Sequence, residues 1–337
     1  MALSRRELIA GAAAAAASIV LPTPVLAQRR GRNDGPVRTE RPELAAGAMQ
    51  ITPFAFTVAF MTESRATARA GGGLLGGGFG GRSSTRSTLV GIADVDFQAA
   101  TDTAWQVFQD RLTASGVQLG DRAALMASLS NRFRPLEQGL ERDIIESRNE
   151  TSKARLFAPS THGSPVFMQE WGEHVQSAGI NGVTHMVNAN MGAAAYARSM
   201  GVPVVSTLLV VSFADAETYG GAFRNTSSVS VESALALLPE RSLLSIYANG
   251  RVGEVSLNQP IASAGDFGSF DNANTTGDRI GQGIANVIGV LGGIGTNSSN
   301  RMTMTADPAR WRDGVNDIMS QGLTTLIDAM AGGSAAG

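Results

Sequence analysis

Residues 203–213 read Pro203-Val-Val-Ser-Thr-Leu-Leu-Val-Val-Ser-Phe213, and this long β-branched and apolar run predicts a buried strand. Residues 229–237 alternate apolar with small or polar side chains, which predicts a second strand. Leu243–Tyr247 and Val252–Leu257 flank Asn249-Gly250, a dipeptide typical of a tight hairpin turn. Strands joined by short connections pair antiparallel, so we expect an antiparallel C-terminal part of a sheet.

Strands and helices alternate before this region. Phe54–Met61 predicts a buried strand, and Thr88–Phe97 predicts another. A helix is expected to begin at Thr101 or Asp102, because four apolar side chains then share one face: Ala104, Trp105, Phe108 and Leu112. A C-terminal helix that starts at Asp307-Pro308 carries a second apolar stripe. The sequence therefore predicts an α/β (α+β) fold, with a mixed sheet whose C-terminal strands are antiparallel and flanked by helices.

The chain contains no Pro/Ser-rich linker after residue 50, so we expect a single domain over residues 49–332. Residues 121–190 are interpreted as a helical insertion in that domain. The remaining predicted elements are a short strand at 117–119, helices at 122–130, 136–153 and 167–177, a brief strand at 182–187, a helix at 193–200 and a loop at 261–278.

The first 27 residues have the features of a signal peptide. Ser4-Arg5-Arg6-Glu7-Leu8-Ile9 places two arginines before an alanine-rich apolar run, and Val25-Leu26-Ala27 offers a cleavage site. The paired arginines resemble a bacterial twin-arginine export signal, with an ordinary secretory signal as the alternative. The apolar run is too short to span a bilayer, and no Cys follows it for lipidation. We therefore expect a periplasmic or secreted protein with no transmembrane span after cleavage.

Two segments have the composition of loops rather than packed elements. Residues 28–48 are rich in Arg and acidic side chains with two prolines, which predicts a flexible lead. Residues 70–81 read Ala70-Gly-Gly-Gly-Leu-Leu-Gly-Gly-Gly-Phe-Gly-Gly81. Glycine loops bind phosphate when they lead into a helix, but this one lacks Gly-Lys-Ser/Thr and precedes no helix start. We interpret it as a loop insertion.

The order of elements resembles a known group of envelope proteins. Helices ending in Ala114-Ser-Gly-Val117 and in Tyr196-Ala-Arg-Ser-Met-Gly-Val202 lead into strands, and a strand pair around Gly253-Glu-Val255 follows. This succession is similar to the periplasmic α/β domain of CsgG-type curli-secretion lipoproteins, LpoB-type lipoproteins and the TolB N-terminal domain. The similarity spans roughly residues 88–120 and 190–258 and the last helix. It implies an envelope scaffold or accessory protein without chemistry of its own.

Among the acidic residues, Asp94 and Asp96 are the strongest candidates for a catalytic role. They lie two positions apart at the end of a predicted strand, so their side chains are expected to point the same way. Two neighbouring carboxylates can bind a cation or divide acid and base roles. The alternative is that they cap the next helix and face solvent.

The three histidines are His162, His174 and His185, and none has the spacing of a histidine metal motif. Glu170 and His174 are four positions apart on a predicted helix, which makes them weak candidate metal ligands. His162 stands two positions before Ser164, a potential base beside a potential nucleophile, but the chain has no Gly-x-Ser-x-Gly elbow. We expect no resident metal and no cofactor.

Composition narrows the class of function. The chain has 337 residues, a net charge of -2 and no Cys, which excludes disulfides, thiol nucleophiles and cysteine metal sites and argues against nucleic-acid binding. We expect a non-catalytic periplasmic accessory or scaffold protein that binds an envelope protein in secretion or assembly. One alternative is an exported hydrolase-like enzyme that uses Asp94, Asp96 and a histidine. Another is a self-assembling surface protein, and a homo-oligomer is compatible with the sequence.

Overall fold

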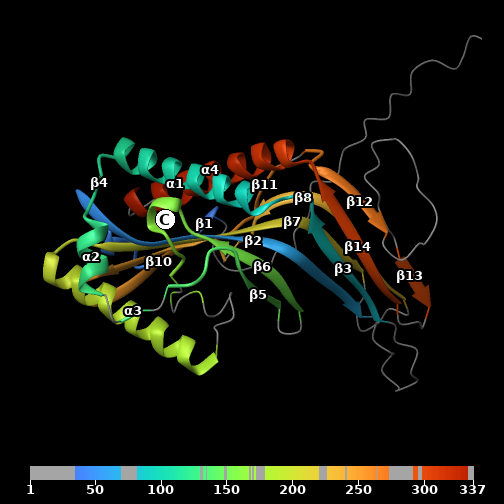
Figure 1. The fold of residues 1–337 in the computed structure, drawn as a ribbon, viewed down its shortest axis with the longest axis horizontal. Coiled ribbons are helices and arrows are strands. Elements are labelled where there is room, and N and C mark those ends of the chain that lie inside the picture. The colour runs from blue at the N-terminus through green and yellow to red at the C-terminus, as the bar shows by residue number, and fades with distance from the viewer. Residues whose placement is uncertain are drawn as a thin grey trace, which may run out of the picture. The chain divides into compact units, whose positions relative to one another are not determined.

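The computed structural model describes residues 35–69, 82–129, 132–133, 135–147, 150–166, 168, 171, 179–219, 226–239, 241–263, 265–272, 291–294 and 298–332. Within this part the chain forms an α/β fold with four α-helices and a mixed sheet, which confirms the predicted fold class (Figure 1). The expected signal peptide, the start of the lead and the glycine-rich loop 70–81 lie outside the described residues.

The described strands and helices follow one another in a partly alternating order. The helices are α1 (Asp94–Ala114), α2 (Arg122–Ser128), α3 (Gly179–Met200) and α4 (Pro308–Gly332), with 3-10 turns η1 (Pro42–Leu44) and η2 (Ser160–His162). The strands are β1 (Val37–Glu40), β2 (Gln50–Arg69), β3 (Arg82–Val90), β4 (Gln118–Leu119), β5 (Leu140–Ser147), β6 (Glu150–Phe157), β7 (Val204–Tyr219), β8 (Thr226–Leu237), β9 (Leu243–Ala248), β10 (Arg251–Leu257), β11 (Ile261–Ser263), β12 (Gly268–Asn272), β13 (Leu291–Ile294) and β14 (Ser298–Ala306).

Strand β2 runs through the middle of the sheet and changes partners along its length. Its first half pairs parallel with β7, from Thr52 opposite Val204 to Phe60 opposite Val211. It also pairs antiparallel with β6 and, further along, with β3; Glu63 lies between the two, opposite Lys153 of β6 and Thr88 of β3. The path across the sheet is β1-β10-β9-β7-β2-β3-β14-β12, and β14 is parallel to β3. The predicted antiparallel run β7 to β10 is confirmed.

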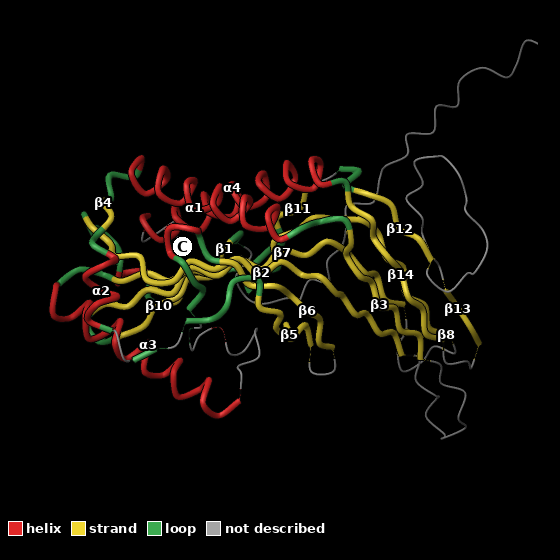
Figure 2. The backbone as a smooth tube through the Cα atoms, in the orientation of Figure 1, coloured by secondary structure: helices red, strands yellow, loops and turns green. Residues whose placement is uncertain are grey.

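Helices cover both faces of the sheet in its central part. Helices α1 and α4 pack against each other on one face, whereas α3 lies on the other (Figure 1). Every residue of β9 is buried as a result, and Tyr247 Oη donates to Asn190 Oδ1 of α3 at 3.4 Å. Strands β3, β8, β13 and β14 continue past the ends of α1 and α4 (Figure 2). No helix in the described ranges has the length and apolar character needed to cross a membrane.

Local chemistry explains where the confirmed elements begin and turn. Helix α4 starts where predicted, because Asp307 Oδ1 accepts hydrogen bonds from the backbone N–H groups of Ala309 and Arg310 at 3.0 Å. Asn249 and Gly250 both have positive φ, 51° and 70°, as a two-residue hairpin turn between β9 and β10 requires.

Three predicted elements are wrong. The sequence predicts a helix at 136–153. Residues 140–157 instead form the β5–β6 hairpin, inside the region 121–190 that is expected to be a helical insertion. Leu140 and Ile144 are four positions apart, which suggests a helix, but both fit a strand that pairs with β6. Residues 182–187 belong to α3 rather than to a strand. Residues 261–278 are expected to be a loop, but the described residues among them contain β11 and β12. Residues 264 and 273–278 lie outside the described residues.

The lead is ordered from residue 35 onward, so its predicted flexibility is also wrong over that stretch. Strand β1 pairs antiparallel with β10, from Val37 opposite Leu257 to Glu40 opposite Glu254. Gly253 permits this approach, because a Cβ there would lie 2.8 Å from the carbonyl oxygen of Glu40. Backbone pairing needs few apolar side chains, and composition therefore gave no signal for it.

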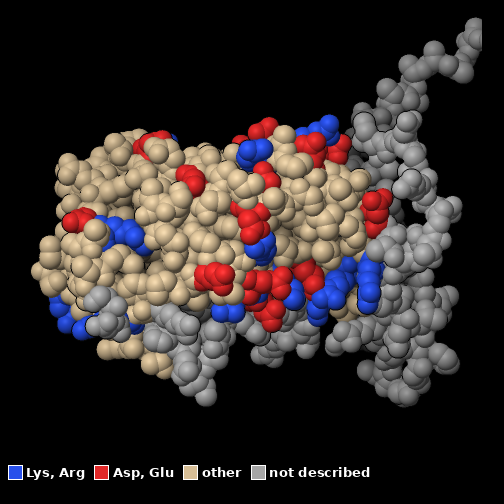
Figure 3. All heavy atoms as spheres, in the orientation of Figure 1, with Lys and Arg blue, Asp and Glu red and all other residues tan. Residues whose placement is uncertain are grey.

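Charged side chains on the visible face gather in a band along its middle and lower edge, with uncharged areas beside it (Figure 3). Many of the acidic groups are paired. Glu63 is held by Arg65 at 2.7 Å and by Arg86 at 2.5 Å, and Lys153 contacts Glu141 at 2.6 Å. The Lys153–Glu141 pair is exposed, and such pairs contribute little to stability individually, whereas the carboxylate of Glu63 is buried between its two arginines.

Candidate functional site

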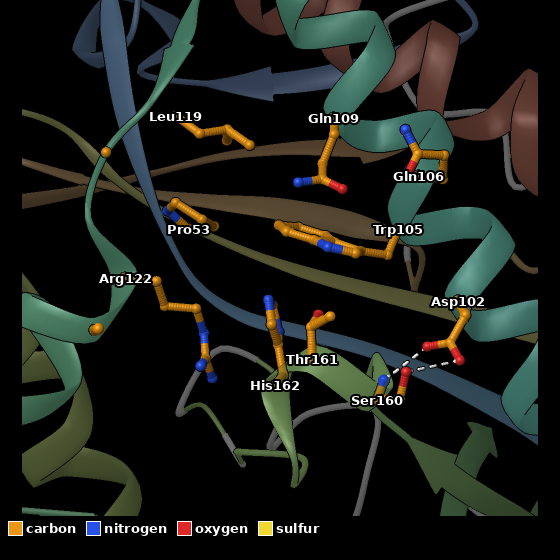
Figure 4. Close-up of a pocket in the computed structure, with 12 residues that line it drawn as sticks. Pro53, Asp102, Trp105, Gln106, Gln109, Leu119, Arg122, Ser160, Thr161 and His162 are labelled. Atoms are coloured by element: carbon orange, nitrogen blue, oxygen red, sulfur yellow. Dashed lines mark hydrogen bonds between the residues drawn. The ribbon is translucent and has the colours of Figure 1, made fainter.

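A hollow of about 640 Å³ lies between α1, the β4–α2 connection and η2 (Figure 4). Helix α1 supplies Asp102, Trp105, Gln106 and Gln109, which share one helical face because they are spaced by three or four residues. The other lining residues are Pro53, Leu119, Gly120, Arg122, Ala123, Ser160, Thr161 and His162.

Trp105 forms the apolar wall of the hollow. Its indole stacks on Phe108 with ring centroids 5.4 Å apart and meets Phe56 edge-on at 5.3 Å. His162 lies edge-on to the same indole at 4.5 Å. Only 9% of Trp105 is exposed, so its ring is held rigidly by the core behind it.

His162 is uncharged at neutral pH. Burial, and then the nearby positive charge of Arg122, lowers the pKa of His162 to about 3. Its Nδ1 atom is buried and has no hydrogen-bond partner within the described residues. A catalytic histidine base needs an orienting partner on one nitrogen and a substrate on the other. His162 lacks that arrangement in the described structure.

Arg122 brings a positive charge to the side of the hollow that lies opposite Asp102 (Figure 4). It is the first residue of α2, whose N-terminus is capped by Asp121, and its Nε donates to the carbonyl oxygen of Phe54 at 3.0 Å. Burial lowers the pKa of Arg122 to about 10, so the side chain is still protonated at neutral pH. The described part of the chain offers it no carboxylate partner.

Asp102 connects α1 to η2 rather than activating His162. Its Oδ1 accepts from the backbone N–H of Ser160 at 2.7 Å, and its Oδ2 accepts from the Ser160 hydroxyl at 3.0 Å (Figure 4). Gln98 Nε2 also donates to Oδ1 at 3.2 Å. The Ser160 hydroxyl is thus directed at a carboxylate, so Asp102, His162 and Ser160 do not form a catalytic relay.

A second hollow of about 440 Å³ adjoins the first and shares Asp102 with it. Its other lining residues are Asp94, Val95, Gln98, Ala99, Gln138 and Phe157. Val95 is 73% exposed, which is unusual for a large apolar side chain on a helix. The two hollows therefore follow the same outer face of α1.

The predicted pairing of Asp94 with Asp96 is wrong. Gly91, with φ of 91°, follows the end of β3, and both acids fall in the first turn of α1, where negative charge is favourable. Residues two apart on a helix are rotated by about 200° around its axis, so their side chains point in nearly opposite directions. Asp94 binds both Nη atoms of Arg155, whereas Asp96 accepts from the backbone N–H of Ala93 at 3.2 Å. The capping alternative holds for Asp96.

The expected helix start at Thr101 or Asp102 is likewise wrong, because α1 begins at Asp94. The candidate ligands Glu170 and His174 lie outside the described residues, and the side chain of His185, within α3, does as well. Over the ranges that the structure describes, no group of three or more His, Cys, Asp or Glu is placed to hold a metal ion.

Sequence reasoning identified His162 but not its neighbours in the hollow. The apolar helix face predicts a buried position for Trp105, which is correct for most of its surface but misses the side that lines the hollow. The spacing of Asp102, Trp105, Gln106 and Gln109 along one face of a helix was the signal that could have found the site. No such signal exists for Arg122, because only the tertiary fold brings α2 to α1.

Comparison with protein-family models, with curated proteins and with solved structures finds no match to this chain.

Proposed function

We propose that this protein is a non-catalytic accessory protein of the bacterial cell envelope that binds a protein partner through the hollow between α1, α2 and η2. The observation that carries this proposal is the position of Arg122. The Arg122 side chain is half-buried, lines the same hollow as Trp105, and has no carboxylate partner among the described residues. Placing a charge in such a site is costly unless a ligand compensates it.

The residue types in the hollow are those that protein interfaces use most. Arg and Trp side chains dominate the energetics of interface hot spots, particularly when they lie in preformed depressions. Gln106 and Gln109 add adaptable amides, and Figure 4 shows the Gln109 amide directed into the hollow. The neutral His162 and the occupied Asp102 favour binding over proton transfer.

The envelope assignment is supported by the sequence of the first 27 residues. Paired arginines, a short apolar run and a small residue at the cleavage position are typical of exported bacterial proteins. A location in the periplasm is part of the same proposal.

The test is site-specific photocrosslinking in intact cells. We expect a photoreactive residue at Gln106 to capture one envelope protein at near-equal stoichiometry, and the same residue at exposed Ser199 of α3 not to capture it. The identified partner, purified and mixed with this protein, should form a one-to-one complex. Identical products from both positions, or a captured protein that does not rebind when purified, would contradict the proposal.

A further inference from the structure

The first hollow offers a ligand one positively charged group, which suits a ligand group with a single negative charge. Arg122 is the cation among its lining residues, His162 is neutral, and Asp102 supplies a negative charge at the opposite side. A phosphate dianion would meet Asp102 with only one guanidinium to balance it. A carboxylate instead matches the two Nη groups of Arg122, since its Nε already donates to the Phe54 carbonyl, and the Gln109 amide is a second donor that lines the same hollow.

The two hollows together describe an elongated ligand. They share Asp102 and follow α1 from Asp94 to Gln109, which corresponds to about 22 Å along a helix. An extended peptide of about six or seven residues has this length. Val95 in the second hollow provides exposed apolar surface for its side chains.

The position of Arg122 favours a chain end over an internal acidic side chain. Arg122 and Asp102 lie at opposite sides of the first hollow (Figure 4), and the second hollow adjoins the first through Asp102, the residue that lines both. Behind Arg122, its Nε is bound to the Phe54 carbonyl and α2 begins. A chain that follows both hollows therefore has one of its ends on the Arg122 side of the first hollow.

We propose that the partner is recognised by its free C-terminal carboxylate, which binds Arg122, while its last apolar side chain packs on Trp105 and the preceding residues follow α1 over Val95. This inference rests on the proposed function, since it specifies what the hollow binds.

The direct test compares peptides that differ only at their end. Fluorescein-labelled Gly-Ser-Ala-Ala-Val-Phe is prepared with a free carboxylate, as the C-terminal amide, and as an amide with Glu in place of Phe. Fluorescence anisotropy with the full chain should show the free acid binding at least about tenfold more tightly than either amide, as expected for a lost charge-assisted hydrogen bond. Acid and amide binding within twofold of each other, or no binding of any peptide, would overturn the inference.

Variants then locate the two ends of the ligand. Arg122→Gln should remove the difference between acid and amide, and Arg122→Lys should restore part of it, whereas Arg38→Gln on exposed β1 should change nothing. Val95→Asp should weaken the hexapeptide at least threefold but leave N-acetyl-phenylalanine unaffected, because the small acid does not reach the second hollow. Equal effects of Arg122→Gln and Arg38→Gln would also contradict the assignment. The acid and amide comparison on the unmodified protein holds even if a variant misfolds.

The two proposals fail in different ways. Capture of a partner from Gln106, together with equal binding of acid and amide, would reject carboxylate recognition and leave the accessory function in place. Arg122-dependent binding of the free acid without a captured partner would support carboxylate recognition and reject the protein-partner function.

Discussion

His162 makes the folded protein sensitive to acid. In the unfolded chain a histidine takes up a proton as pH falls through about 6.5. In the folded protein the pKa of His162 is about 3, because burial and Arg122 oppose its positive charge. Between these values the unfolded state binds more protons, so the free energy of unfolding falls as pH decreases. We expect a loss of about 2 kcal/mol between pH 7 and pH 5 from this residue, measured by urea unfolding.

The matched comparison is His162→Gln, which cannot take up the proton. Its stability should change less between pH 7 and pH 5 than that of the unmodified protein, by about the same 2 kcal/mol. A parallel decline of the two proteins would mean that His162 does not carry the effect.

At the residue scale, the sequence indicated which residues matter better than it indicated which side chains surround them. His162 was recognised as a candidate, and Trp105 and Phe108 were correctly placed on the buried face of a helix. Asp94 and Asp96 were misjudged because the helix starts seven residues earlier than its most favourable cap suggested. That shift changes their side-chain periodicity from 2 to 3.6 and separates two groups that a strand would have aligned.

At the element scale, α4 approaches β8 closely enough to require glycine. A Cβ on Gly322 would overlap the Cδ1 atom of Leu237, which is fully buried and therefore cannot move away freely. Ala normally stabilises a helix by about 1 kcal/mol relative to Gly, but overpacking a core costs about 1–3 kcal/mol. We therefore expect Gly322→Ala to destabilise the protein by up to about 2 kcal/mol in thermal or urea unfolding.

Gly332 at the end of the same helix is the control, because a Cβ there would meet nothing within 4 Å. Gly332→Ala should leave stability unchanged or raise it slightly. If both substitutions stabilise the protein equally, the close packing of α4 on β8 is incorrect.

Elements with a strong local pattern could be predicted, and those formed by distant pairing could not. Strands β7 to β10 combine β-branched runs with an Asn-Gly turn, and α4 combines an apolar stripe with an Asp cap. The charged residues of the β5–β6 hairpin are compatible with either an exposed helix or an edge strand. Only its pairing with β2 decides between them, and that contact joins residues about 90 positions apart.

At the scale of the whole molecule, burial on both faces predicts where hydrogen exchange is slowest. All of β9 is buried, whereas only Val37 of β1 is partly covered. Amides of β9 should exchange only through global unfolding, at least about 100-fold more slowly than those of β1. Hydrogen exchange followed by mass spectrometry measures both segments in one experiment.

The same experiment examines the ordered lead. Because β1 pairs with β10, its amides should still exchange more slowly than those of an unstructured chain. Free-chain exchange rates over residues 37–40 would show that the lead is flexible after all, and rapid exchange in β9 would contradict the two-sided packing of the sheet.

The path of the sheet was beyond sequence reasoning for a physical reason. Periodicity shows that a strand has a buried face but not which strand lies beside it. Strand β2, for example, pairs with β7, with β6 and with β3 along different, partly overlapping parts of its length. Each of these pairings is specified by the complete tertiary structure.

The parallel pairing of β3 with β14 also determines when this chain can finish folding. Ser83 lies opposite Ser298, so one of the two neighbours of β3 is synthesised more than 200 residues after β3 itself. Contacts between such distant positions slow folding, because a long loop must close before they form. During synthesis the edge of β3 therefore stays open until the last part of the chain emerges. A chain ending before β14 would keep an unpaired strand edge, the kind of surface that chaperones bind and that aggregates when left unprotected.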